Sequence, residues 1–321
     1  MTDSDTDTAA GDAASAAGWF ENLSLGGSST PDDARAARES ITTGEAPAPR
    51  DWPALAVEAG VADSEDDYYD RLHAATTAAT RETVRERERA DDAQLVHTIR
   101  AMDDCERTAN ELAERAAEWA GSLFDDAEPG IDGARAVAER EPESELERRA
   151  VSLAGRVVDL AGERDELAAT IDRLAPAVAP NLAEMAGPEL AARLIALAGG
   201  LESLAKKPSG TVQVLGAEDA LFAHLSGRAP SPKHGIIYTH EHVRNTRPED
   251  RGSASRALAG KLTLAARVDH YSGERRATLH EELRERMATI RARGATDEGS
   301  ERSDDAIADE ADDIDAEASD E

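Results

Sequence analysis

Apolar residues recur in steps of three and four along two long segments in the middle of the chain. In the first segment the recurring positions are Met102, Cys105, Ala109, Leu112, Ala116, Trp119 and Leu123. In the second segment they are Leu146, Ala150, Leu153, Val157, Leu160, Leu167, Ile171 and Leu174, and Arg164 interrupts the rhythm once. This spacing is typical of a coiled-coil seam rather than of the broader apolar face of a globular helix. It predicts two rod-like helices.

The connection between these helices contains the turn residues Glu128-Pro129-Gly130 and Glu141-Pro142. A connection of roughly 20 residues favours an antiparallel hairpin, which we assign to residues 76–178 and which Pro176 and Pro180 should end. The outer surface of such a hairpin could bind a second copy of the chain, and a helical bundle within one monomer is the alternative. The predicted seam consists of Met102, Leu112, Trp119, Leu153, Val157, Leu160, Leu167 and Ile171.

The rest of the chain divides into four parts, which makes the protein mainly α. Residues 1–18 are predicted to be a disordered leader, and residues 19–75 a small α/β N-terminal domain whose helix from about residue 64 is capped by Asp63 or Ser64. Residues 179–294 are expected to form an all-helical domain. Residues 295–321 hold 13 acids and one arginine, which indicates a disordered acidic tail.

The chain is strongly acidic, with a formal net charge of -31 over 321 residues. The acids are spread widely, and only four lysines accompany 32 arginines, which favours adaptation to molar salt over a local acidic partner surface. We found no apolar stretch of the length that a membrane helix needs, and the first residues resemble no secretion signal. A single cysteine, Cys105, suits a reducing compartment. We therefore expect a cytoplasmic protein.

The acidity lapses between residues 201 and 294, where 16 Lys and Arg face 11 Asp and Glu. All four lysines and six of the eight histidines lie in this window. A basic island in an acidic chain is typical of a nucleic-acid partner, although a buried or oligomeric domain would also escape an acidic coating.

Catalytic and metal-binding motifs are missing from the sequence. Gly260-Lys261 resembles the end of a P-loop, but Ser255 and Leu262 occupy positions where that motif needs glycine and Ser/Thr. His234, His240 and His242 are spaced as metal ligands can be, without an evident fourth ligand. Cys105 lies on the predicted seam and is interpreted as a packing residue. These observations predict a protein that is not an enzyme and holds neither metal nor cofactor.

Several short sequence motifs follow one another between residues 179 and 274. They are Ala179-Pro180-Asn181-Leu182, Ala192-Arg193-Leu194-Ile195, Ala198-Gly199-Gly200-Leu201, Val214-Leu215-Gly216-Ala217-Glu218, Pro232-Lys233-His234-Gly235-Ile236-Ile237-Tyr238, Ser255-Arg256-Ala257-Leu258-Ala259-Gly260-Lys261, Ala266-Arg267-Val268-Asp269 and Tyr271-Ser272-Gly273-Glu274. In these motifs, and in their order, the chain closely resembles the Nop domain of archaeal Nop-type scaffold proteins of box C/D small ribonucleoproteins. Upstream, Asn110-Glu111-Leu112-Ala113-Glu114-Arg115 resembles the coiled coil of that family.

The resemblance implies an adaptor in three parts. The N-terminal domain of the family holds fibrillarin, the S-adenosylmethionine-dependent methyltransferase, so that cofactor would belong to the partner. The coiled coil self-associates as a homodimer, and the Nop domain binds a kink-turn guide RNA already held by a small ribosomal-type protein. Together these proteins direct 2′-O-methylation of rRNA and tRNA. A spliceosomal Prp-type assembly factor of the same fold, or a coiled-coil interaction protein without RNA, are the alternatives.

The predicted RNA- and RNP-binding residues comprise cations, histidines and one motif shared with the family. They are Gly216, Ala217, Glu218, Lys233, His234, His240, Arg247, Arg251, Arg256 and Lys261. The arginines and lysines would contact phosphates, and His234 or His240 would stack on an unpaired base. Asp219 and Ser253 occupy positions where relatives usually carry lysine, so we expect free RNA alone to bind poorly. Relatives also carry a different sequence at the position of Phe124-Asp125-Asp126-Ala127.

Overall fold

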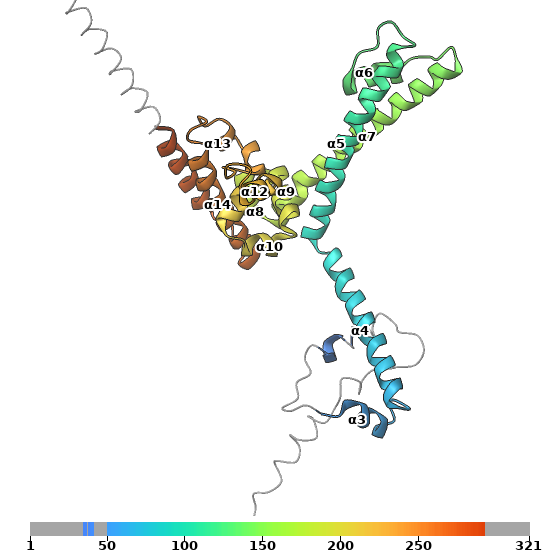
Figure 1. The fold of residues 1–321 in the computed structure, drawn as a ribbon, viewed down its shortest axis with the longest axis vertical. Helices are drawn as coiled ribbons and strands as arrows, with labels where there is room; N and C mark the ends of the chain where they lie inside the picture. Colours follow the sequence, from blue (N-terminus) through green and yellow to red (C-terminus); the bar gives the residue numbers. More distant parts are fainter. Residues whose placement is uncertain (1–34, 37, 42–49, 293–321) are drawn as a thin grey trace, which may run out of the picture. The chain divides into compact units, whose positions relative to one another are not determined.

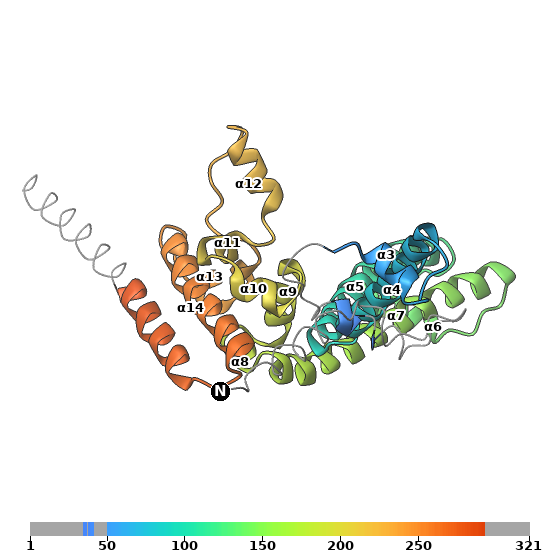
Figure 2. The same cartoon turned by 90° about the horizontal axis from the view of Figure 1, so that it is seen from below.

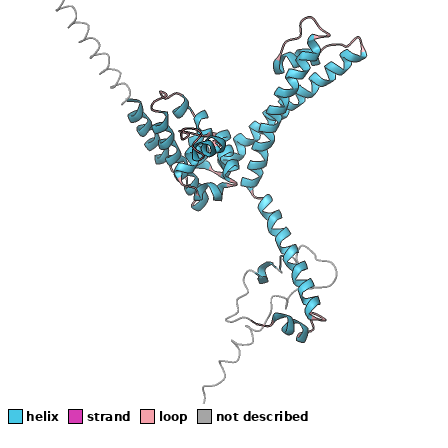
Figure 3. Cartoon of the chain, viewed as in Figure 1, coloured by secondary structure: helices cyan, strands magenta, loops and turns pink. Residues whose placement is uncertain are grey.

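The computed structural model describes residues 35–36, 38–41 and 50–292, and every regular element in these ranges is a helix (Figure 3). The predicted leader, the acidic tail and most of residues 19–49 lie outside the described residues. The chain divides into two compact units, Met1–Ala90 and Asp91–Glu321. The mainly helical fold class is thereby confirmed.

The described part of the N-terminal unit is built on α3 (Trp52–Glu58) and α4 (Glu65–Glu88). Apolar residues of the two helices and their connection pack together: Ala56, Ala62 and Tyr68 are buried, and Trp52, Val61 and Leu72 cover them. The Ser64 hydroxyl accepts the Asp67 N–H at 3.2 Å, so Ser64 is the helix cap. The predicted strands do not occur among the described residues of this unit. The predicted boundary after residue 75 falls inside α4, because this helix continues without a break to Glu88.

The second unit begins with the predicted antiparallel hairpin (Figure 1). It pairs α5 (Asp91–Gly121) with α7 (Glu145–Val178), and α6 (Gly130–Ala138) lies against both near the turn. The Ser144 hydroxyl caps α7 by accepting the Glu147 N–H at 3.1 Å. The Glu147 carboxylate accepts the Glu143 N–H at 2.7 Å, which lowers the pKa of Glu147. Pro176 lies inside α7 and does not end it: the helix continues for two residues to Val178, although the proline has no N–H to donate to the preceding turn.

Alanine forms most of the buried seam of the hairpin. Its fully buried positions are Ala109, Ala113, Ala116 and Ala120 on α5 and Ala150, Ala154, Val157 and Ala161 on α7. The steps of four and three are those predicted, but the buried line is shifted by one position from several predicted residues. Met102, Val157 and Ile171 are buried as expected, whereas Leu112, Trp119, Leu153, Leu160 and Leu167 are half-buried. Small side chains let the helices approach closely, so the larger ones lie beside the contact line.

Enlarging one seam alanine should therefore destabilise the hairpin. Ala154 is 0% exposed, and Ala154→Leu adds three carbons where α7 meets α5 and α6. Overpacking of this kind costs about 1–3 kcal/mol, which urea denaturation followed by circular dichroism would measure. Ser152→Leu, at an exposed position on the same helix, is the matched control and should change stability by less than about 0.5 kcal/mol. Equal effects of the two substitutions would contradict an alanine seam.

The C-terminal domain is helical throughout its described residues, as predicted. Its elements are α8 (Pro180–Ala186), α9 (Pro188–Ala198), α10 (Leu201–Lys206), α11 (Ser209–Val214), α12 (Glu218–Leu225), the 3₁₀ turn η1 (Ile236–Thr239), α13 (Glu241–Arg244), α14 (Arg251–Tyr271) and helical residues 277–292. Its core is continuous with the base of the hairpin, because Ile99 and Met102 of α5 are buried in the same cluster as Leu194, Leu258 and Leu262.

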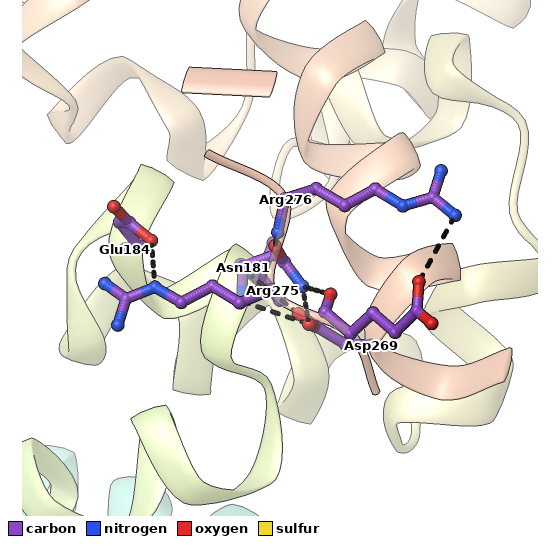
Figure 4. Close-up of polar contacts among 7 residues, drawn as sticks. Asn181, Glu184, Asp269, Arg275 and Arg276 are labelled. Atoms are coloured by element: carbon purple, nitrogen blue, oxygen red, sulfur yellow. Dashed lines mark hydrogen bonds and ion pairs between the residues drawn. The ribbon is translucent and has the colours of Figure 1, made fainter. Parts of the chain in front are cut away.

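A buried polar group joins the start of α8 to the end of α14 (Figure 4). The Asp269 carboxylate accepts the backbone N–H groups of Asn181 and Leu182 at 3.0 and 2.8 Å, and the Asn181 side-chain amide at 2.6 Å. The other side of Asn181 holds the chain after α14: its Oδ1 accepts the Arg276 N–H at 2.6 Å, and its Nδ2 donates to the Glu274 carbonyl at 2.8 Å. Asp269 and Asn181 thus tie together segments 88 residues apart.

Candidate nucleic-acid interface

The predicted RNA-binding segment around His234 is held by backbone pairing with the end of α11. Gly235 N–H donates to the Gln213 carbonyl and Ile236 N–H to the Leu215 carbonyl, both at 2.8 Å. The Gln213 side chain adds a bond to the Lys233 carbonyl at 2.7 Å. A Cβ on Gly235 would lie 2.0 Å from the Leu215 oxygen, so only glycine allows this close approach.

His234, Tyr238 and Arg251 form a stacked group that we call the stacking cluster. The His234 ring lies on the Tyr238 ring with centroids 4.6 Å apart and planes 24° from parallel. The Arg251 guanidinium lies over the same tyrosine, 5.4 Å from its centroid. Partial burial, followed by the charge of Arg251, lowers the pKa of His234 and favours its neutral form. A neutral, half-exposed ring that is already stacked on Tyr238 on one side is suited to stacking on a planar base.

Cations surround the stacking cluster at the start of α14. Arg251 is oriented by its Nε, which donates to the Thr246 carbonyl at 3.1 Å, and no carboxylate of the described residues is bonded to its guanidinium. Lys233 is exposed, and its aliphatic chain passes near Gly252. Arg256 is also exposed, five residues further along α14, and its side chain makes no hydrogen bond or ion pair within the described part of the chain. Lys233, Arg251 and Arg256 are therefore free to pair with phosphates.

Three of the predicted residues form ion pairs or hydrogen bonds inside the domain. Arg247 pairs with Glu249 at 3.2 Å and Asp250 at 3.0 Å, and Lys261 pairs with Glu282. His240 uses both ring nitrogens inside the domain: Nε2 contacts the Met185 carbonyl at 3.0 Å, and Nδ1 accepts the His242 N–H at 3.1 Å. Burial lowers the pKa of His240. Of the two histidines that the sequence analysis considered for base stacking, His240 is thus engaged inside the domain, and His234 remains the candidate.

Gly216, Ala217 and Glu218 form the turn into α12. Gly216 has a φ of 81°, a conformation that favours glycine, and its N–H donates to the Glu218 carboxylate at 2.8 Å. The turn lies beside the stacking cluster's segment, because a Cβ on Gly216 would lie 3.3 Å from that of Ile236. Figure 2 shows α12 standing away from the other helices of the domain. No residue of α12 is buried, and Phe222 and Leu225 are 66% and 75% exposed.

Within residues 35–36, 38–41 and 50–292, no three His, Cys, Asp or Glu side chains are arranged to hold a metal ion. None of the helices in those ranges is both long and apolar enough to span a bilayer.

Two contributors to the site were missed as sequence candidates, Tyr238 and Gln213. Tyr238 follows His234 by four residues, a separation that brings side chains together on one face of a helical turn, and this signal was available. Gln213 acts from a distant segment through the Lys233 carbonyl. Nothing local in the sequence indicates this bond. Arg193 of α9 forms ion pairs with Asp103 of α5 at 2.7 Å and with Glu189 of its own helix.

Comparison with known proteins places this site in a recognised domain. The Nop family, described as "snoRNA binding domain, fibrillarin", matches residues 88–291. An uncharacterised NOP5 family protein of Methanocaldococcus jannaschii is 33% identical over 73% of this chain and 66% of its own length. Nucleolar protein 56 of Schizosaccharomyces pombe is 48% identical over 30% of this chain, and human nucleolar protein 58 is 43% identical over 37%.

These matches span 19% and 23% of the two nucleolar proteins, so much of each relative has no counterpart in the alignment. A solved fibrillarin/Nop5p complex resembles the structure with a TM-score of 0.47 and 27% identity, over 79% of this chain and 92% of that one. The family match covers well over half of the chain, including the hairpin and the stacking cluster. The chain belongs to the Nop family.

Proposed function

We propose that this protein is a non-catalytic scaffold of a box C/D small ribonucleoprotein, which binds a kink-turn guide RNA together with its primary kink-turn protein. The observation that carries the proposal is the stacking cluster in a chain of net charge -31: the His234 ring stacks on Tyr238, and the cations beside it have no carboxylate partner among the described residues. Proteins read irregular RNA by stacking unpaired bases and contacting the nearby backbone.

The kink-turn protein supplies the part of the affinity that this chain lacks. Asp219 and Glu218 are exposed in the first turn of α12, and their negative charges weaken the attraction of the domain for phosphates. The exposed Phe222 and Leu225 on α12 give this helix an apolar surface of the kind that lies at the centre of protein interfaces. A composite surface of RNA and protein therefore fits the C-terminal domain better than RNA alone.

A gel-shift on a box C/D guide RNA in molar KCl, with and without the kink-turn protein, tests the proposal. We expect a supershift only when that protein is present. His234→Ala should weaken the assembly about tenfold, because loss of one stacked base costs about 1–3 kcal/mol. His73→Ala, at an exposed histidine in the other unit, is the matched control and should bind as wild type. Wild-type-like binding by His234→Ala would remove the stacking role, and tight binding of RNA alone would remove the composite site.

The hairpin is proposed to join two copies of the chain. Leu146, Leu153 and Leu160 recur every seven residues on α7 and so form one stripe beside the alanine seam. Leu146 is 59% exposed, while Leu153 and Leu160 are half-buried in the monomer. Exposed leucines at this spacing are typical of a helix that pairs with another helix.

The N-terminal unit is proposed to recruit fibrillarin, so that guided 2′-O-methylation of rRNA and tRNA depends on the partner's S-adenosylmethionine. The description of the family names fibrillarin, and α3 and α4 offer a packed pair whose exposed apolar residues include Tyr69 and Val84. We further propose that this chain performs no chemistry, binds no cofactor of its own and works in the cytoplasm.

A further inference from the structure

The solvent-exposed face of α14 carries no acidic residue. Its exposed positions are Ser253, Arg256, Leu264, Arg267 and Tyr271, which recur at helical spacing on one side of the helix. The only acid in this 21-residue helix is Asp269, which is buried and bonded to Asn181 and Leu182. A chain of net charge -31 would be expected to coat such a helix with carboxylates, as it does elsewhere.

A second group of cations meets this face at its C-terminal end, far from the stacking cluster. Arg267 donates to the Ala205 and Lys207 carbonyls at 3.0 and 3.5 Å, so its guanidinium is anchored to the end of α10 by neutral oxygens. Lys207 follows directly, and no carboxylate within the described residues pairs with its ammonium group. Lys206 is paired with Glu202, and its pKa is raised by that carboxylate and further by the nearby Tyr271.

The aromatic component of this patch is Tyr271. Its side chain is 67% exposed, and the His270 ring meets it edge-on with centroids 4.6 Å apart. Tyrosine hydroxyls, lysines and arginines are all side-chain groups that contact the phosphates and sugars of a nucleic-acid backbone. We call Lys206, Lys207, Arg267 and Tyr271 the distal patch.

We propose that the distal patch binds the phosphate backbone of the RNA whose kink is held at the stacking cluster, so that the Nop domain contacts one RNA at both ends of α14. This proposal rests on the function proposed above. Arg251 and Arg267 are 16 residues apart, which corresponds to about 24 Å along a helix. An A-form RNA stem of roughly eight or nine base pairs covers that distance, so only an RNA with a stem of that length reaches both sites.

The test compares two RNAs in the presence of the kink-turn protein. One RNA holds the kink-turn with a stem of about three base pairs, and the other extends that stem to about ten. Lys206→Gln/Lys207→Gln removes two charges from the distal patch. Arg148→Gln/Arg149→Gln removes two charges from exposed positions on α7, where both arginines pair with Glu145 much as Lys206 pairs with Glu202.

We expect the lysine variant to bind the long RNA about tenfold more weakly and to lower the slope of log affinity against log salt by about two, one for each lost phosphate contact. Its binding to the short RNA, and the binding of the arginine variant to either RNA, should equal wild type. Lys207→Gln alone removes one of these two contacts and should lower the slope by about one.

Equal binding of the long RNA by wild type and the lysine variant would overturn the distal patch. An equal loss on both RNAs would also overturn it, because the effect would then not depend on reach. Failure of the wild-type protein to bind either RNA would instead refute the proposed function, and the distal patch with it. Photocrosslinking of Tyr271 to the long RNA, and not to the short one, is the direct readout.

Discussion

Arg251→Glu/Arg256→Glu is expected to abolish assembly of the protein with guide RNA and kink-turn protein. The double substitution changes the local charge by four units at the start of α14, where Lys233 is the remaining exposed cation beside the stacking cluster. It replaces two attractive contacts by two repulsive ones, and it removes the guanidinium over Tyr238. A loss of at least a hundredfold should follow, measured by gel-shift or by fluorescence anisotropy.

Arg251 also has an internal role, so the double variant needs companions. Its Nε bonds the Thr246 carbonyl, and glutamate cannot replace that bond. Arg256→Glu alone changes an exposed residue without a partner, so it should leave the fold intact and still weaken binding about tenfold or more. Arg148→Glu/Arg149→Glu is the control of equal charge change on the hairpin and should assemble normally. Normal assembly by Arg256→Glu and by the double variant would exclude this end of α14 as an RNA contact.

The sequence predicted those parts of the fold that depend on periodicity. Steps of three and four gave both long helices and their antiparallel pairing, and the end of α7 at Val178 is the predicted end of the hairpin. The choice of seam was less accurate, because a pattern of apolar positions does not distinguish alanine that is packed between helices from leucine that lies beside them. Close helix approach favours the smaller residue, as Ala113 and Ala154 show.

The sequence predicted the candidate site as a set of charged and histidine residues. The structure distinguishes those that already have partners inside the domain from those that are exposed. Arg256 and Lys261 look alike in the sequence, five residues apart on one helix, yet Lys261 pairs with Glu282 and Arg256 is exposed. His234 and His240 are likewise equivalent as histidines, and only the Met185 carbonyl and the His242 N–H show that His240 is occupied. Glu282 and Met185 come from distant segments, so no local pattern reveals these partners.

Removal of the Asp269 carboxylate should have the largest effect on stability. Asp269 is 8% exposed and accepts three N–H groups, from the Asn181 and Leu182 backbones and the Asn181 side chain. Asp269→Ala leaves these donors buried without an acceptor, and each unsatisfied donor costs about 1–3 kcal/mol. We expect a loss of about 3–5 kcal/mol in the free energy of unfolding, measured by the shift of the urea midpoint.

The loss of stability in Asp269→Ala should also affect the last helical residues of the domain. Asn181 positions the Arg276 N–H and the Glu274 carbonyl, just before helical residues 277–292, which pack on the core through Leu283, Met287 and Ile290. Once Asp269 no longer holds Asn181, hydrogen exchange of the amides in residues 277–292 should accelerate. Glu184→Ala removes the nearby surface ion pair with Arg275, 2.9 Å long, and serves as the control, since exposed pairs contribute less than about 1 kcal/mol. If Asp269→Ala unfolded at the same urea concentration as this control, the buried carboxylate would not be what holds α8 and α14 together.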